Sequence, residues 1–236
     1  MNKPDRLESN MKAAADYRLA GEINKAEEIY AGIATRDEPP FARGYGIQHL
    51  ALCTRSRAET ARDEGEAERA EALFARAGAD FEQAAQEYER VGDFVRASAA
   101  RLDIGVLYLR QGDPDLAVMA IRQSIAYLKG HEQDESDQVF VDEHLGIKYA
   151  RLAEALLAAG DTEAAVKILE QAQQTPQRNE YFVMVTEGIA GDVYRACADT
   201  DRAVNQFKSA LKKAKQFGDN AYEKKYREAL DSLSAG

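Results

Sequence analysis

The chain has 236 residues and a formal net charge of −10; 45% of its residues are hydrophobic and 31% are charged. The acidic balance argues against nucleic-acid binding, which needs a cationic face for the phosphates. No apolar run approaches the ~20 residues that cross a bilayer, so we predict no membrane insertion.

The first part of the chain is predicted to form two helical pairs. Apolar residues recur at three-and-four spacings over residues 9–34, with a break at Gly21, and this period is typical of amphipathic helices. A second, longer pair is predicted over 41–91. Its middle segment, 58–72, is nearly all charge and alanine, which leaves open whether it forms a loop or the projecting ends of two long helices.

The third predicted pair, residues 94–129, has the clearest turn. Gly112 is expected to end the first helix because glycine accepts the left-handed backbone conformation without strain. Asp113 can cap the free amides of the next helix with its side chain, and Pro114 suits the first turn, where its nitrogen needs no hydrogen bond.

Two further pairs are predicted over 138–174 and 179–217, followed by a single amphipathic helix over 220–234. The fourth pair breaks at Gly160, with Asp161 as the expected cap of its second helix. The final helix is predicted to cover an otherwise exposed core at the end of the array.

A fixed order of small and bulky residues recurs in four of the five pairs. We interpret the small residues as points of close approach between helices, and the bulky ones as filling the groove toward the next pair. The clearest copies are Gly105, Tyr108, Ala117, Ile121 and Ser124, and Gly191, Tyr194, Ala203, Phe207 and Ala210.

This pattern resembles the tetratricopeptide repeat (TPR), in a divergent long-helix variant. The resemblance implies an all-α fold, a right-handed superhelical array of about five antiparallel helical hairpins with a C-terminal capping helix, in one domain over residues 1–236. The family's repeats are roughly 34 residues long. The small residues that open the second helices here, Ala26, Ala77, Ala117, Ala165 and Ala203, are spaced 51, 40, 48 and 38 apart.

The resemblance also implies a non-catalytic scaffold or adaptor, whose concave groove holds a peptide or helix of a partner protein. In the family, the first helix of each pair lines this groove. Arginine is favoured for such contacts because its planar guanidinium binds two acceptors at once. The predicted partner-binding residues are Leu102, Val106, Leu109, Arg110, Arg151, Glu154, Asp192 and Arg195.

Two other hypotheses assign the chain to different functional classes, a sensor and an enzyme. The chain could be a peptide or small-ligand sensor that regulates an effector by changing the curvature of its superhelix. It could also be a metal-dependent enzyme centred on His131 to His144, where carboxylates and imidazoles gather, although a polar loop gives ligands no periodic reason to converge. We predict no cofactor, no metal and no catalysis; the expected partner is a protein or peptide, and homo-oligomer formation stays open.

Cys53 and Cys197 are the only cysteines, and they lie far apart in the sequence. Two cysteines cannot form a disulfide framework, so we expect free, half-buried thiols in a reducing compartment. The N-terminus lacks the apolar core of a secretion signal. We therefore predict a cytoplasmic location.

Overall fold

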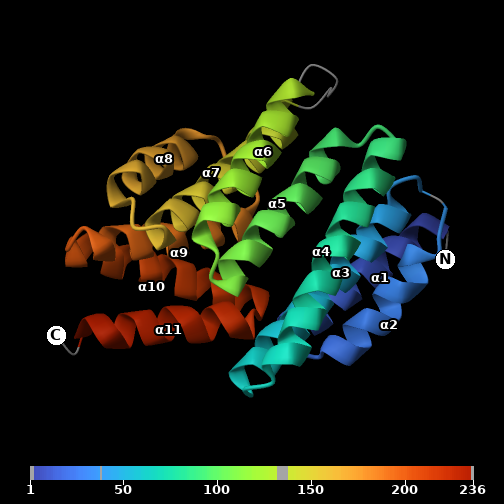
Figure 1. Cartoon of the computed structure of the whole chain (residues 1–236), viewed down its shortest axis with the longest axis horizontal. Helices are drawn as coiled ribbons and strands as arrows, with labels where there is room; N and C mark the ends of the chain where they lie inside the picture. Colours follow the sequence, from blue (N-terminus) through green and yellow to red (C-terminus); the bar gives the residue numbers. More distant parts are fainter. Residues whose placement is uncertain (1–2, 38, 132–137, 235–236) are drawn as a thin grey trace. The chain divides into compact units, whose positions relative to one another are not determined.

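The computed structural model describes residues 3–37, 39–131 and 138–234. In these ranges it contains eleven helices and no strand, which confirms the all-α prediction (Figure 1). The helices are α1 (Lys3–Leu19), α2 (Ile23–Ala34), α3 (Ala42–Asp63), α4 (Ala67–Arg90), α5 (Phe94–Gln111), α6 (Pro114–Gly130), α7 (Gln138–Ala158), α8 (Thr162–Gln174), α9 (Glu180–Ala196), α10 (Thr200–Phe217) and α11 (Asn220–Ser234). They divide into two compact units, Met1–Gln111 and Gly112–Gly236.

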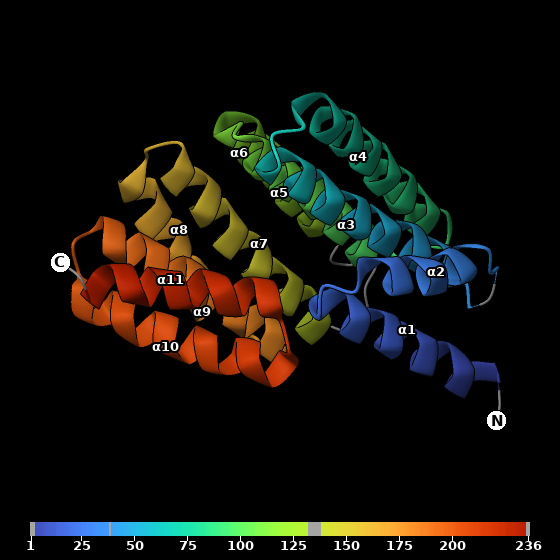
Figure 2. The same ribbon diagram turned by 90° about the horizontal axis from the view of Figure 1, so that it is seen from below.

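In the first unit, each helix from α1 to α5 packs against the next along the chain (Figure 2). Segment 58–72 forms the ends of two long helices and not a loop, because α3 and α4 extend through it and meet at a turn around Gly65. Three of the five alanines of the segment form a buried inner face, while the other two are exposed. Ala58, Ala61 and Ala70 are at most 3% exposed and belong to one hydrophobic cluster of this unit.

Two glycines of α3 allow close contacts with neighbouring helices. A Cβ on Gly44 would lie 2.9 Å from a ring carbon of Tyr88 in α4, and a Cβ on Gly46 would lie 2.3 Å from the backbone nitrogen of Ala34 in α2. Side chains at these positions would hold the helices apart.

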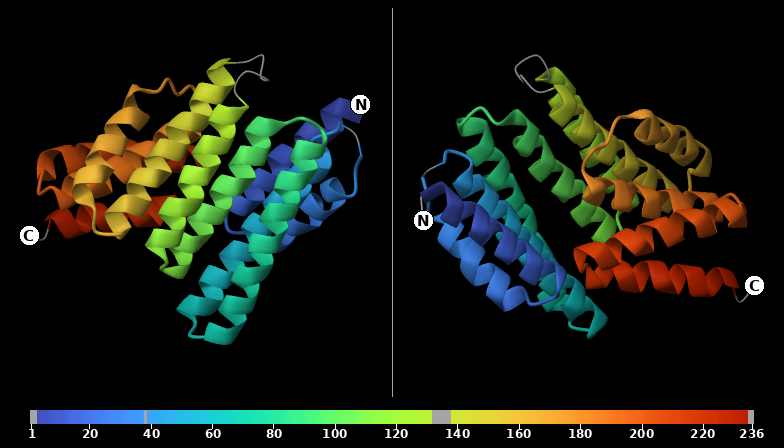
Figure 3. Two further views of the ribbon diagram at one scale, coloured as in Figure 1. Left: turned by 45° about the horizontal axis from the view of Figure 1, so that its top comes forward. Right: turned by 180° about the vertical axis from the view of Figure 1, so that it is seen from behind.

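The second unit comprises α6 to α11, and Figure 3 shows α9, α10 and α11 side by side. In it α7 packs against α6, α8 and α9, while α10 packs against both α9 and α11. The small residue Gly191 accommodates an aromatic ring, because a Cβ there would lie 2.6 Å from Cε1 of Phe207. At Gly191 the nearest neighbour is therefore the phenylalanine ring, and the small-against-small contact with Ala203 stays a prediction.

The boundary between the units falls inside the third predicted pair, so α5 and α6 belong to different units. The packing of Gly105 against Ala117 and the single-domain organisation accordingly stay predictions. Gly112 has the expected left-handed conformation, with φ of +88°. Asp113 occupies the N-cap position of α6, but its side chain accepts no capping hydrogen bond, contrary to our expectation. Asp161 does cap α8, accepting a bond from the Ala164 amide at 3.0 Å.

The turn between α9 and α10 has alanine where several other turns have glycine. Ala198 has φ of +58°, a left-handed conformation that costs an L-residue about 1 kcal/mol. Ala198→Gly is therefore expected to raise the free energy of unfolding by about 0.5 to 1 kcal/mol, measured by urea denaturation. The same change at Ala196, in the last turn of α9, should lower it. Equal effects at both positions would contradict the assignment of strain to Ala198.

A half-buried histidine in the first unit makes stability depend on pH. The His49 ring lies between the rings of Tyr30 and Tyr45, with centroids 4.8 and 4.0 Å away. Burial, together with the charge of Arg18, lowers the pKa of His49 from 6.5 to about 3. The neutral form is therefore favoured in the folded state, so its stability contribution is complete above pH 6.5 and is lost as pH falls toward 3.

Because of His49, we expect the free energy of unfolding to fall by about 1 kcal/mol for each pH unit below about 6. His49→Phe should remove this part of the pH dependence, because phenylalanine does not titrate. Urea denaturation of both proteins at pH 7.5 and at pH 5 measures the difference. Identical losses on acidification would show that His49 titrates normally in the folded state.

Candidate partner-binding face

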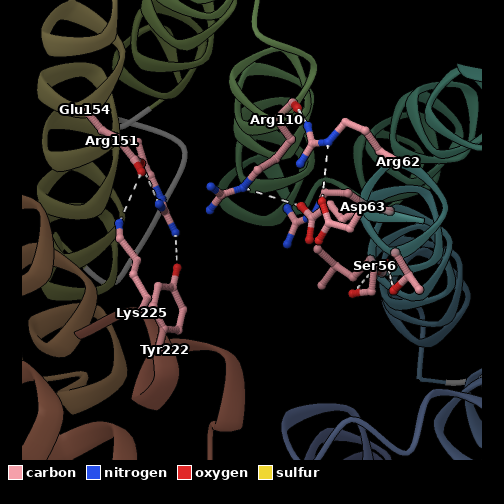
Figure 4. A network of polar contacts seen from close by, with 12 residues as sticks. Ser56, Arg62, Asp63, Arg110, Arg151, Glu154, Tyr222 and Lys225 are labelled. Carbon is pink, nitrogen blue, oxygen red and sulfur yellow. Dashed lines mark hydrogen bonds and ion pairs between the residues drawn. The ribbon is translucent and has the colours of Figure 1, made fainter. Parts of the chain in front are cut away.

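The predicted partner-binding residues of the first unit lie on α5, and they differ in exposure. Leu102 and Val106 are 8% and 4% exposed, so they present little surface to a partner. Leu109 is partly exposed, and so is Arg110, whose guanidinium forms an ion pair with Glu59 of α3 at 3.4 Å (Figure 4).

In the second unit, Arg151 of α7 is held by two neighbours. Its guanidinium donates to the carboxylate of Glu154, one turn further along α7, at 2.6 Å, and to the hydroxyl of Tyr222 on α11 at 2.7 Å (Figure 4). The side chains of Arg151 and Glu154 are only 12% and 16% exposed. Arg151 is therefore a half-buried link between α7 and α11, and much of its hydrogen-bonding capacity is used within the unit.

The same network continues onto α9. Lys225 of α11 lies with its Nζ 3.1 Å from a carboxylate oxygen of Asp192 and 4.0 Å from one of Glu154. Asp192 also accepts a hydrogen bond from Arg195 at 2.8 Å. We call the surface formed by Arg151, Glu154, Asp192, Arg195 and Lys225 the first-helix face. The name refers to α7 and α9, the first helices of the fourth and fifth pairs; Lys225 comes from the final helix, α11. The face has three cations and two carboxylates, and the most exposed is Arg195, at 44%.

The position of α11 depends on a ring that fills the space left by a glycine. Tyr226 is 1% exposed, and a Cβ on Gly188 of α9 would lie 2.3 Å from its ring. Asp219 caps the start of α11: its carboxylate accepts the Tyr222 amide at 3.1 Å and the Tyr181 hydroxyl at 3.0 Å. These contacts aim Tyr222 and Lys225 at α7 and α9.

Sequence reasoning missed Tyr222, Lys225 and Asp219. The pair Gly218–Asp219 carries a signal for the helix boundary, since a left-handed glycine followed by a capping aspartate is typical of a helix end and a new start. No signal in the sequence shows which earlier helices the last one touches.

The metal hypothesis rests on His131 to His144, of which residues 132–137 lie outside the described residues. Nδ1 of His131 lies 2.8 Å from the backbone oxygen of Tyr127, and the His144 ring packs edge-on against Phe140 and Phe182. The described part of the chain holds no group of three or more potential ligands placed to bind a metal ion.

The two thiols differ, contrary to the expectation that both are half-buried. Cys53 is buried, and burial raises the pKa of its thiol to about 11, while Cys197 is exposed at the end of α9. Within the described ranges, every helix is too short or too polar to cross a bilayer.

No protein-family model matches this chain, and no curated protein matches it either. Among solved structures, BtubC (BKLC) from P. vanneervenii is similar, with a TM-score of 0.51 and 17% identity over 93% of this chain and 87% of that one. A Podosopora anserina protein, described as a kinesin light chain with nearly identical TPR-like repeats, has a TM-score of 0.49 and 18% identity over 90% and 97%. The chain has the predicted TPR-like fold.

Proposed function

We propose that this chain is a non-catalytic scaffold or adaptor that binds a peptide or helix of a partner protein on the first-helix face. The observation that supports this most is the network from Arg151 through Lys225 to Arg195, which brings charged groups of α7, α9 and α11 onto one surface. The α5 residues belong to the other unit and are proposed separately as partner contacts, with Leu109 and Arg110 as the more exposed members. A cytoplasmic location is part of the same proposal.

The charged side chains of the first-helix face are already ordered, which favours the binding of a partner protein. Arg151, Glu154 and Asp192 are less than a fifth exposed and are ordered by contacts within the unit, so binding a partner there costs little side-chain entropy. Arg195 is the exposed end of the network, and its guanidinium can contact a partner while it keeps its bond to Asp192. Charges at such a position govern partner choice and the rate of association.

The test is partner capture by affinity purification, followed by a measured Kd for the protein identified, with variants of single charges. We expect Arg195→Glu to weaken binding about tenfold or more, because it replaces the most exposed cation of the face with a carboxylate beside Asp192. Lys212→Glu, at an exposed site on α10, is the matched control and should bind normally. Equal affinity of both variants would refute this face as the binding site.

A further inference from the structure

The first unit has a hollow of its own between α1 and α2, with a volume of about 500 Å³. This is within the size range of sites that hold small ligands or short peptide segments. It is lined by Asn10, Tyr17, Lys25, Glu28, Ile29, Gly32 and Arg36.

The hollow contains three polar side chains of different kinds that are not used by the fold. Among the residues that the structure describes, the side chains of Asn10, Glu28 and Arg36 form no hydrogen bond or ion pair. Lys25, by contrast, pairs with Glu22, and its ammonium lies 5.1 Å above the Tyr17 ring. An amide, a carboxylate and a guanidinium thus remain available to a ligand.

The spacing of the two charges limits what that ligand can be. Glu28 lies on α2 and Arg36 lies two residues beyond the end of that helix at Ala34, so at the helical rise of about 1.5 Å per residue their backbones are separated by about 12 Å. A free amino acid, whose ammonium and carboxylate are joined through one carbon, is too short to reach both. An extended chain advances about 3.3 Å per residue, so roughly four residues cover this distance.

We propose that the α1–α2 hollow binds an extended peptide segment about four residues long, with a basic side chain over Glu28 and an acidic side chain toward Arg36. The Asn10 amide can both donate to and accept from a peptide backbone. Tyr17 and Ile29 supply apolar contact, and Gly32 leaves room for the bound chain, since an added Cβ there would meet no atom within 4 Å. This site is independent of the first-helix face.

The probe is the blocked peptide Ac-Lys-Ala-Leu-Glu-NH2, titrated into the ¹⁵N-labelled full chain and followed by NMR. We expect saturable shifts of backbone amides in α1 and α2, with the Gly32 amide as the central reporter. The neutral peptide Ac-Gln-Ala-Leu-Gln-NH2 should bind roughly fivefold more weakly, because it lacks both charges. A reversed charge order is not a useful control, since an open groove can accept a chain in either direction.

Two variants make the test specific. The double variant Glu28→Gln with Arg36→Gln should bind the charged peptide no better than the neutral one, whereas Lys212→Gln on α10 should change nothing. Gly32→Leu places a side chain into open space and should abolish binding without lowering the free energy of unfolding, because leucine is a better helix former than glycine. Absent or unsaturable shifts in α1 and α2, or full affinity in the double variant, would overturn the proposal and leave the first-helix face unaffected.

Discussion

Gly46→Ala is expected to lower the free energy of unfolding by about 2 kcal/mol, although alanine is the better helix former by about 1 kcal/mol. The added Cβ would lie 2.3 Å from the backbone nitrogen and 2.6 Å from the Cα of Ala34. Both are backbone atoms of a neighbouring helix, so α2 and α3 must separate to admit the methyl group. Urea denaturation measures the loss.

Gly32→Ala is the matched control, since it makes the same change inside a helix of the same unit. No atom lies within 4 Å of the Cβ that would be added there. Helix propensity should then dominate, and the variant is expected to gain about 0.5 to 1 kcal/mol. Similar effects of the two substitutions would show that α2 and α3 do not meet at Gly46.

Tyr226→Ala is expected to cost about 3 to 5 kcal/mol, because it removes a ring that is 1% exposed and leaves a cavity beside Gly188. The ring also stacks on Tyr222, with centroids 5.5 Å apart. Without this anchor, α11 should loosen from α9, and Tyr222 would lose its position beside Arg151. Partner binding on the first-helix face should weaken together with stability.

Tyr226→Phe separates the ring from its hydroxyl. The hydroxyl donates to the backbone oxygen of Met184 at 3.4 Å, a long bond, so its loss should cost no more than about 1 kcal/mol. Urea denaturation of both variants, with near-ultraviolet circular dichroism of the native state, distinguishes the effects. A small loss in Tyr226→Ala would mean that α11 is not anchored by this residue.

Helical periodicity was sufficient to predict the helices, since turns such as those at Gly21 and Gly160 interrupt clear amphipathic patterns. The first helix begins at Lys3, six residues before its predicted start at residue 9. Leu7 is the one large apolar side chain in that added stretch, and it is 4% exposed. A single apolar residue among charges defines no period, so the pattern alone could not place this start.

The sequence predicts four of the five residues of the first-helix face, and the fifth, Lys225, is placed there only by tertiary contacts. The resemblance to a known repeat gave Arg151, Glu154, Asp192 and Arg195, and the structure brings these four together. Lys225 lies on the final helix, whose amphipathic pattern predicts only a cover for the core, so the repeat gives no reason to place it on this face. The boundary between the two units was also not predicted, because its turn at Gly112 has the same glycine conformation as turns within a unit.

Site-specific photo-crosslinking tests the proposed binding face most directly. A photoreactive amino acid would be placed at position 195, on the first-helix face, and separately at position 212, on the exposed side of α10. We predict that a partner protein crosslinks at position 195 and not at position 212. Crosslinking of the partner at position 212 alone, or equally at both positions, would contradict binding at the first-helix face.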